Sequence, residues 1–341
     1  MAAVPLGHPQ FALHPSHGVH NPTIRAPRRR PGSMRRTSSL DMMRAEGTVD
    51  PLYLRGEARD YYTAGDRSGE VTGSASLRAT VDRAVGSISQ LNVFPAVAAI
   101  ESMVPVPAMS GFRSAVDRVA PELRRARDLR YTLLDDVPVT TLISGHALSA
   151  SGATRLARET YSPVADLCAG FISGGVLMTS FEGGEPAVVT GPDAPALDRD
   201  DDPVAWHHMP TLAVQNMRRL RRIDVSPGAS PGVVAIDAMF RDSYVRADNV
   251  ETVIHEYVLN ADVEAESRTI VGCRASARVL PWPECLPASA SAQRSVGMTL
   301  SELHSTVRTD FIGTQTCTHL NDLLRSVADA ESLIAQLTLR G

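Results

Sequence analysis

Alternating apolar and polar side chains mark two groups of strands along this chain. In the first group, residues 34–42 are strand-like, residues 53–62 alternate, and residues 71–85 and 87–93 continue the pattern. Alternation with a period of two predicts strands that bury one face. Turn residues near 47–51 and 65–69 separate the segments. The pattern therefore predicts four strands, although residues 71–85 also fit a helix.

Helical patterns follow the strands. Residues 111–119 predict a helix that stops at Pro121, and residues 133–136 with 141–148 predict a helical pair. Residues 168–172 are a short apolar run, which we interpret as a buried strand. Residues 183–202 are rich in Gly, Pro and Asp and predict a long connection.

The first pattern then recurs in the second half. Residues 217–225 repeat residues 34–42 at an offset of 183 positions, and Arg241-Asp242 repeats Arg59-Asp60 at an offset of 182. A predicted helix at 300–309 matches the earlier one at 111–118. One period kept across strands and helices indicates an internal duplication.

The predicted fold class is therefore α+β, with two tandem, internally duplicated units packed about a pseudo-two-fold axis. Each unit is an antiparallel sheet followed by helices. A cleft between two such units is a preferred place for a ligand. We expect four regions: a flexible polar arm (1–33), the first α+β repeat (34–150), a strand and long connection (151–210), and the second α+β repeat (211–341).

The polar arm carries a histidine at every third position. His14, His17 and His20 can hold a soft metal ion if they form one helical turn, but Pro15 and Gly18 oppose that turn. A mobile or surface-draped arm is the preferred interpretation.

Composition narrows the class of protein. The net charge of −4 argues against general nucleic-acid binding. The chain has no apolar run near 18 residues and no C-x-x-C pair among its four cysteines. We expect a cytoplasmic protein with no membrane partner, and a homodimer stays open.

The densest group of reactive side chains lies between Cys317 and Asp322 at a predicted helix start. A helix N-terminus lowers the pKa of a nearby thiol, so Cys317 can act as a nucleophile with His319 as its base. A metal site built from Cys317, His319 and either Cys285 or His255 is a second interpretation.

The structural alternative for the same segment is that Cys317 is a small buried apolar group and Thr318 caps the helix. No metal or other cofactor is required by the preferred interpretation.

The predicted strands of the second half carry further candidates. Asp237, Arg241 and His255 can face one another across a hairpin, since residues four apart on a strand share a face. Carboxylates buried beside histidine suit acid/base chemistry. The neighbouring Arg218 and Arg219 can hold a carboxylate or phosphate. The alternative for all of them is a set of structural ion pairs.

Two acidic motifs suggest terpenoid cyclisation. Residues 198–201 form a D-x-D-D box, and Asn321-Asp322 begins a partial magnesium-binding box. Arg325 stands where that second box needs Ser or Thr, and aromatic residues make up only 5% of the chain. Dinucleotide-binding, P-loop and nucleophile-elbow motifs are absent from the sequence.

Several segments resemble an uncharacterised bacterial family, domain of unknown function 2889. The resemblance runs over most of residues 25–335, and its most specific part is the Cys-Thr-His-Leu signature at 317–320. Members often occur beside genes for the catabolism of aromatic, steroid or acyl-CoA compounds, which implies a small organic ligand. The segments that carry the resemblance are 28–41, 237–242, 255–257 and 317–324.

We therefore expect a cofactor-independent lyase, isomerase or hydrolase that acts by acid/base chemistry on a small carboxylated or CoA-linked molecule. A non-catalytic ligand-binding or accessory protein is the alternative, and a terpenoid cyclase ranks third. The expected catalytic residues are His319, Cys317, Asp322, His255 and Asp237, and the expected substrate-binding residues are Arg218, Arg219 and Arg241.

Overall fold

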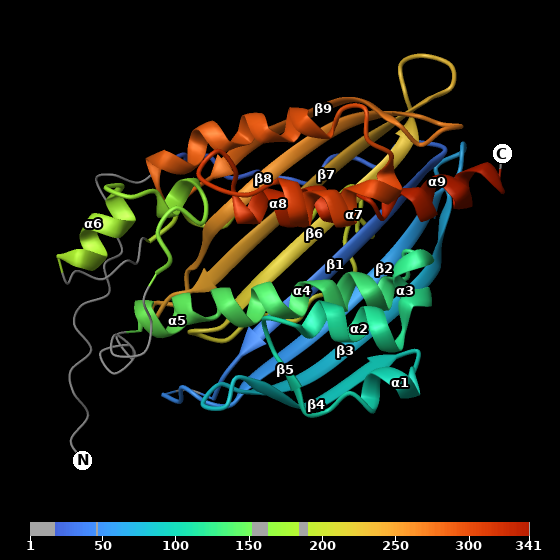
Figure 1. The fold of residues 1–341 in the computed structure, drawn as a ribbon. Helices are drawn as coiled ribbons and strands as arrows, with labels where there is room; N and C mark the ends of the chain where they lie inside the picture. The colour runs from blue at the N-terminus through green and yellow to red at the C-terminus, as the bar shows by residue number, and fades with distance from the viewer. Residues whose placement is uncertain (1–17, 46, 152–162, 184–189, 341) are drawn as a thin grey trace.

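The computed structural model describes residues 18–45, 47–151, 163–183 and 190–340. Within these residues, nine strands form one antiparallel sheet in the order β5-β4-β3-β2-β1-β6-β7-β8-β9 (Figure 1). The strands are β1 (Ser33–Met43), β2 (Leu52–Thr63), β3 (Gly69–Asp82), β4 (Ser87–Phe94), β5 (Val106–Pro107), β6 (Met217–Pro227), β7 (Val233–Val245), β8 (Glu251–Glu264) and β9 (Ile270–Val279). Residues 71–82, for which a helix was an alternative, are thus part of strand β3.

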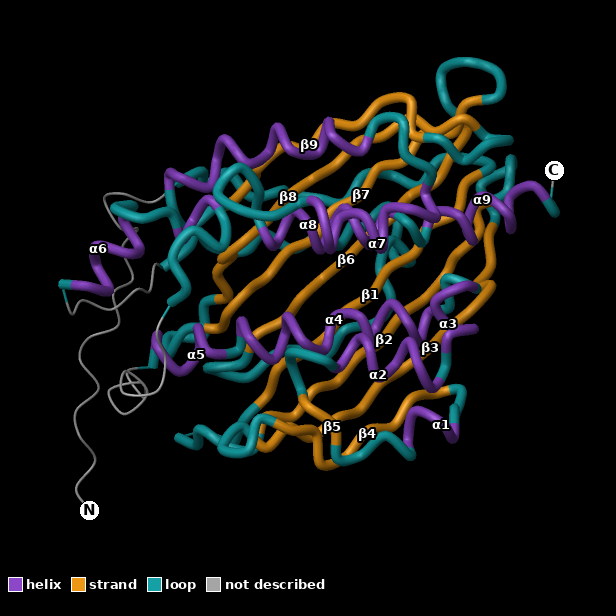
Figure 2. The backbone as a smooth tube through the Cα atoms, viewed as in Figure 1, coloured by secondary structure: helices purple, strands orange, loops and turns teal. Residues whose placement is uncertain are grey.

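The longer helices lie together on one face of this sheet, which we call the helix face (Figures 1 and 2). Helix α4 packs on β1, β2 and β3, whereas α8 packs on β7 and β8, and α9 lies over β1 and β6. The α-helices are α1 (Ala98–Glu101), α2 (Phe112–Val119), α3 (Pro121–Arg125), α4 (Leu129–Ile143), α5 (Gly145–Ala150), α6 (Val176–Glu182), α7 (Leu300–Asp310), α8 (Thr318–Val327) and α9 (Ala330–Thr338). In the described part of the chain, none of these helices is long and apolar enough to cross a membrane.

The two groups of strands meet at the pairing of β1 with β6, which we call the central seam. At its middle, Ser38 lies opposite Arg221. Two ion pairs cross the seam in opposite directions, Arg35 with Asp224 and Arg218 with Asp41, each at 2.5 Å. The arginine side chains are almost fully buried, so a different register of β1 against β6 would leave them without their carboxylate partners. These ion pairs therefore favour the observed register, in addition to the backbone hydrogen bonds.

Between the helix face and the helices lies a layer of buried charges. Arg36 is paired with Asp60, and Arg219 is paired with Asp242, each through two hydrogen bonds. Leaving any one of these charges unpaired would be costly, because water cannot reach it. The members of this ion-pair layer are Arg36, Asp60, Arg113, Asp135, Asp136, Arg219, Arg221, Asp242, Asp322, Arg325 and Asp329.

The opposite face of the sheet is covered by irregular chain from residues 18–32 and 190–216. Ala26 and Trp206 are buried there against Leu220 and Met239. The described part of the expected flexible arm is thus packed on the body of the protein, and Asn21 donates a backbone hydrogen bond to Arg278. His14 and His17 lie outside the described residues.

A buried histidine fixes this cover to the middle of the sheet. His207 lies between Thr37 and Ser39 of β1, with hydrogen-bond distances of 3.0 Å and 2.8 Å from its two ring nitrogens. Burial, together with the charges of Arg59 and Arg218, lowers the pKa of His207 to about 4.

The prediction of a buried strand at 168–172 is wrong. Residues Ala169–Phe171 form a short 3₁₀ helix instead, and the amide of Ala169 donates to the carbonyl of Thr316. A side chain at Gly170 would approach the sulfur of Cys285 to 2.9 Å. The run is apolar because it packs against a second 3₁₀ helix (Pro283–Ser295), and short apolar runs do not distinguish this from strand pairing.

Candidate functional site

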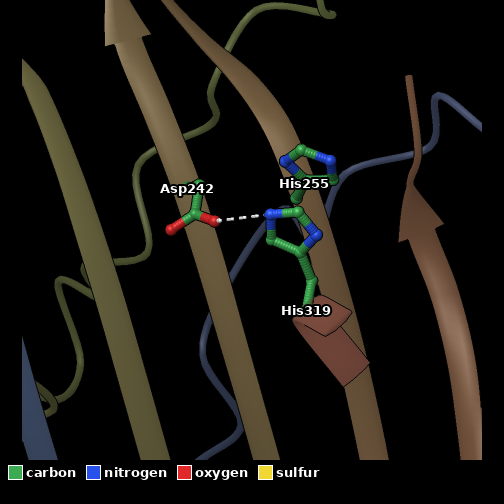
Figure 3. Close-up of side chains that lie close together, drawn as sticks. All are labelled: Asp242, His255 and His319. Carbon is green, nitrogen blue, oxygen red and sulfur yellow. Dashed lines mark ion pairs between the residues drawn. The ribbon is translucent and has the colours of Figure 1, made fainter. Parts of the chain in front are cut away.

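Three side chains from three elements converge on the helix face: Asp242 of β7, His255 of β8 and His319 of α8 (Figure 3). One donor atom from each lies within 4.8 Å of the others. The imidazole rings of His255 and His319 are stacked with centroids 3.6 Å apart. His319 Nε2 points toward Asp242 and lies 4.0 Å from its Oδ2 atom. We call this group the histidine–aspartate centre.

A β-bulge determines that His255 faces this centre. Ser243 pairs with Val253, but Asp242 pairs with His255, so Ile254 is an extra residue in β8. If the pairing continued without a bulge from Ser243 and Val253, His255 would lie opposite Arg241 and would point to the other face of the sheet. The bulge therefore reverses the orientation of His255 and places it beside Asp242.

The expected group of Asp237, Arg241 and His255 is not formed, for the same reason. Asp237 and Arg241 point to the face opposite the helices, where Arg241 is paired with Glu256 at 2.6 Å and Asp237 with Arg222. The register of β8 separates both residues from His255.

The carboxylate of the centre is held rigidly. Arg219 donates to both oxygens of Asp242 at 2.7 Å, and its third nitrogen lies 3.1 Å from Asp322 and 3.5 Å from Asp136. Although burial alone would raise it, the pKa of Asp322 is held well below its ordinary value by Arg325, Arg219 and other arginines. Asp322 is therefore a structural anion that helps to orient Arg219.

Both imidazoles of the centre are neutral in this environment. Burial, followed by the charge of Arg219, lowers the pKa of His319 to about 3. Burial and the neighbouring His319 lower the pKa of His255 well below its ordinary value. A neutral imidazole has one nitrogen with a free lone pair, which can accept a proton or bind a metal ion.

One nitrogen of the centre lacks a partner. His319 Nε2 is buried and, within the described residues, has no hydrogen-bond partner. The ring as a whole is 17% exposed, and His255 is also half-buried. Buried polar atoms are rarely left unpaired, and such atoms are found where a ligand binds. Unlike the unpartnered Nε atom of Arg325 in the ion-pair layer, His319 Nε2 belongs to a neutral ring and can accept a proton or bind a metal ion.

A third histidine comes from the first half of the chain. The ring of His146, in α5, lies against the ring of Tyr244, with centroids 5.3 Å apart. A positive charge on His146 would lower the pKa of His255. Burial lowers the pKa of His146 to about 4. The candidate residues predicted from the sequence include neither His146 nor Asp242.

Cys317 lies apart from the histidine–aspartate centre although it is two residues from His319. It occupies the N-cap position of α8, and it is 3% exposed within the apolar core, where Tyr257 and Cys285 are neighbours. Burial raises the pKa of the Cys317 thiol to about 11, opposite to the lowering that the helix N-terminus suggested. The features of a reactive thiol are absent at this position.

We predict that the Cys317 thiol is inert in the folded protein. A pKa of about 11 leaves roughly a hundredth of the thiolate that an ordinary cysteine carries, and burial blocks reagents. Iodoacetamide at pH 7.5, followed by peptide mass spectrometry, should modify Cys317 at below about 1% of the rate measured in urea. Rapid stoichiometric labelling of Cys317 in the folded protein would restore the nucleophile hypothesis.

Of the predicted substrate-binding arginines, only Arg219 lies at the centre. Arg218 points to the opposite face and is paired with Asp41, and Arg241 is paired with Glu256 on the same face. All three guanidinium groups are hydrogen-bonded to carboxylates, so an anionic substrate would have to share or displace these partners. Their role in substrate binding stays a prediction.

The two acidic motifs of the cyclase hypothesis lie in different surroundings. Asp198 and Asp200 are exposed, and Asp201 is paired with Arg28 and Arg199. The side-chain amide of Asn321 donates a hydrogen bond to the backbone carbonyl of Phe311, and Asp322 belongs to the ion-pair layer.

The first half has a pocket at the matching position. At an offset of 182, Asp242 and His255 correspond to Asp60 and Gly73, which also lie directly opposite each other. A Cβ atom at Gly73 would contact the side chain of Leu129, at the start of α4. Asp60, Gly73 and Leu129 line a pocket of about 250 Å³. The histidine pair thus occurs in the second half, and an open space takes its place in the first.

Comparison with known proteins supports the resemblance noted in the sequence for the second half of the chain. Residues 217–332 match the model of the family described as protein of unknown function, DUF2889. The matched segment runs from β6 to the start of α9, so it contains Asp242, His255 and His319 together. Searches of the curated proteins and of the solved structures found no match.

Proposed function

We propose that this protein is an enzyme that transfers a proton on a small carboxylated or CoA-linked organic molecule, as a lyase, isomerase or hydrolase. The observation that carries the proposal is the pair of stacked, half-buried imidazoles beside Asp242, with His319 Nε2 unpartnered. A general base needs a free lone pair and a fixed orientation, and this centre supplies both. The lowered pKa of His319, about 3, makes it a weak base at neutral pH, so the proposal requires that bound substrate raises that pKa.

The chemistry follows from the positions of the groups. An imidazole nitrogen of His255 or His319 accepts a proton from a carbon atom of the substrate or from water. Asp242 lies 4.0 Å from His319 and offsets the positive charge that forms, while Arg219 keeps the carboxylate in place. The imidazolium that forms in this step then returns its proton to the product, as lyases and isomerases require.

The alternative function is a non-catalytic ligand-binding or accessory protein. The same centre can donate and accept hydrogen bonds to a bound organic molecule without chemical change. The pocket of about 250 Å³ beside Gly73, which lies between the first half and helix α9, is a second place where such a molecule would contact the protein.

We also propose that the chain arose by internal duplication, with a pseudo-two-fold axis at the central seam. Three observations support this. Apart from the two-residue edge strand β5, the strand order is symmetric about the β1–β6 pair. The seam ion pairs Arg35–Asp224 and Arg218–Asp41 exchange under an offset of 183. Bulges after Asp60 and Asp242, and after Thr80 and Asp262, recur at an offset of 182.

The proton-transfer proposal can be tested without knowing the product. A panel of carboxylated and CoA-linked compounds is incubated with the protein in D₂O, and mass spectrometry measures deuterium incorporation. We expect at least one compound to exchange, and His255→Gln and His319→Gln to slow that exchange by at least about 100-fold, the usual contribution of a general base.

His304→Gln is the matched control. His304 is also buried on the helix face and also has an unpartnered ring nitrogen, Nδ1, but it lies beside Tyr131 and Asp135 rather than in the centre. This variant should exchange at the wild-type rate. Exchange that survives in both His255→Gln and His319→Gln would exclude the centre as the catalyst, and saturable binding without exchange would favour the accessory protein.

A further inference from the structure

We propose that Asp242, His255 and His319 bind one borderline divalent metal ion of the Zn²⁺ class. The donor atoms lie on three separate elements yet converge within 4.8 Å, and none of them is a Cys317 sulfur. The binding claim goes beyond the proposed function, since an ion can bind whether or not the centre catalyses proton transfer.

The spacing fits a single ion. His319 Nε2 and Asp242 Oδ2 are 4.0 Å apart, which is too long for a hydrogen bond. Zinc lies about 2.0–2.2 Å from imidazole nitrogen and carboxylate oxygen, so an ion placed between these two atoms reaches both with small side-chain rotations. His255 brings the third donor from its own strand, but its ring is stacked on His319, and one of the two rings must rotate so that both lone pairs point at the ion.

The unpartnered nitrogen is an independent observation. His319 Nε2 is buried and has no hydrogen-bond partner within the described chain, whereas a ligated nitrogen would be satisfied. The carboxylate is prepared in the way that metal ligands usually are, because Arg219 hydrogen-bonds both of its oxygens and fixes its plane. Each oxygen keeps a second lone pair for an ion.

The donor set selects the kind of ion. Two imidazoles and one carboxylate suit Zn²⁺, Co²⁺ or Fe²⁺, whereas Mg²⁺ and Ca²⁺ require mainly oxygen ligands. Three protein ligands leave at least one coordination position open, which is the pattern of catalytic rather than structural zinc sites. Partial exposure of His255 and His319 is consistent with access for water to that position.

A bound ion would change which group accepts the proton in the proposed reaction. This consequence rests on the proposed function, whereas the binding of the ion does not. With the ion bound, His255 and His319 would be its ligands, and a water molecule on the open position would have a lowered pKa. That water would lose a proton to the solvent, and the hydroxide left on the ion would accept the proton of the substrate.

The test is direct binding of Zn²⁺ and Co²⁺ to the full chain. After chelator treatment and desalting, native mass spectrometry with added Zn²⁺ should show one tightly held ion per chain. Co²⁺ should give the intense visible absorption of a four- or five-coordinate site. His255→Gln and His319→Gln should each weaken binding by at least about 10–100-fold, with circular dichroism used to verify folding.

The controls separate this site from other donors. Cys317→Ser and His304→Gln should bind both ions as the wild type does. No stoichiometric ion, or an ion retained equally by His255→Gln and His319→Gln, would overturn the metal site. Because binding is read without turnover, its failure is distinct from a failure of the deuterium-exchange assay, which tests the proposed function separately.

Discussion

Replacing Arg219 by methionine is expected to lower the free energy of unfolding by about 3–5 kcal/mol, or to prevent folding. Arg219 is fully buried and lies within ion-pair distance of Asp242, Asp322 and Asp136. Methionine fills a similar volume, so the expected loss comes from the carboxylates left without their cation. Urea unfolding followed by circular dichroism measures the difference.

Arg78→Met is the matched control for this effect. Arg78 is more than half exposed and lies 3.8 Å from Glu57 on the surface of the sheet. Such exposed pairs contribute between about 0 and 1 kcal/mol, because water screens both charges. If Arg219→Met and Arg78→Met had the same stability, the buried layer would not be a determinant of folding.

Acidification below pH 6.5 is expected to destabilise the protein partly through His207. This side chain is buried between Thr37 and Ser39, and its pKa is lowered to about 4 in the folded state. An unfolded histidine has a pKa near 6.5, so between these two values the unfolded state binds the extra proton. Stability from His207 is therefore complete above pH 6.5 and falls by about 1.4 kcal/mol per pH unit down to pH 4, or about 3 kcal/mol in all.

The contribution of His207 can be separated from that of the other histidines. Urea unfolding at pH 7.5, 6.0 and 5.0 gives the slope of stability against pH. In His207→Gln, the slope of unfolding free energy against pH between pH 6.0 and 5.0 should be smaller by up to about 1.4 kcal/mol per pH unit, the contribution of one bound proton. The same substitution also lowers stability at pH 7.5. An unchanged slope in His207→Gln would refute the linkage.

Much of the secondary structure can be predicted from local patterns. Residues 34–42 and 53–62 lie in β1 and β2, residues 217–225 lie in β6, and the helix predicted at 300–309 is α7. These segments have the right period and clear boundaries, such as the capping box of Thr299 and Glu302 before α7. Mixed helix and sheet with antiparallel pairing was therefore predictable. That both strand groups share one sheet was not, because edge pairing leaves no periodic signal.

The candidate site was only partly predictable. His255 and His319 were selected because histidines near a helix start and on a strand are reactive types, but Asp237 was chosen as their partner instead of Asp242. That choice assumed a regular hairpin, and one extra residue at Ile254 reverses the face of His255. A bulge has no reliable sequence signature, and a shift of one residue changes every contact beyond it.

The central seam also has a consequence for how the chain reaches its native state. Each hairpin in β1–β4 and in β6–β9 joins neighbouring segments, whereas β1 and β6 join positions far apart, such as Met42 and Met217. Closing so long a loop costs entropy before any contact compensates for it, and non-local pairing slows folding. Until that closure, Arg35 and Arg218 lack their cross-seam partners and are hydrated. Pairing of β1 with β6 thus combines closure of a long loop with the dehydration of several charges. We therefore expect the main barrier to assembling the sheet at these two middle strands.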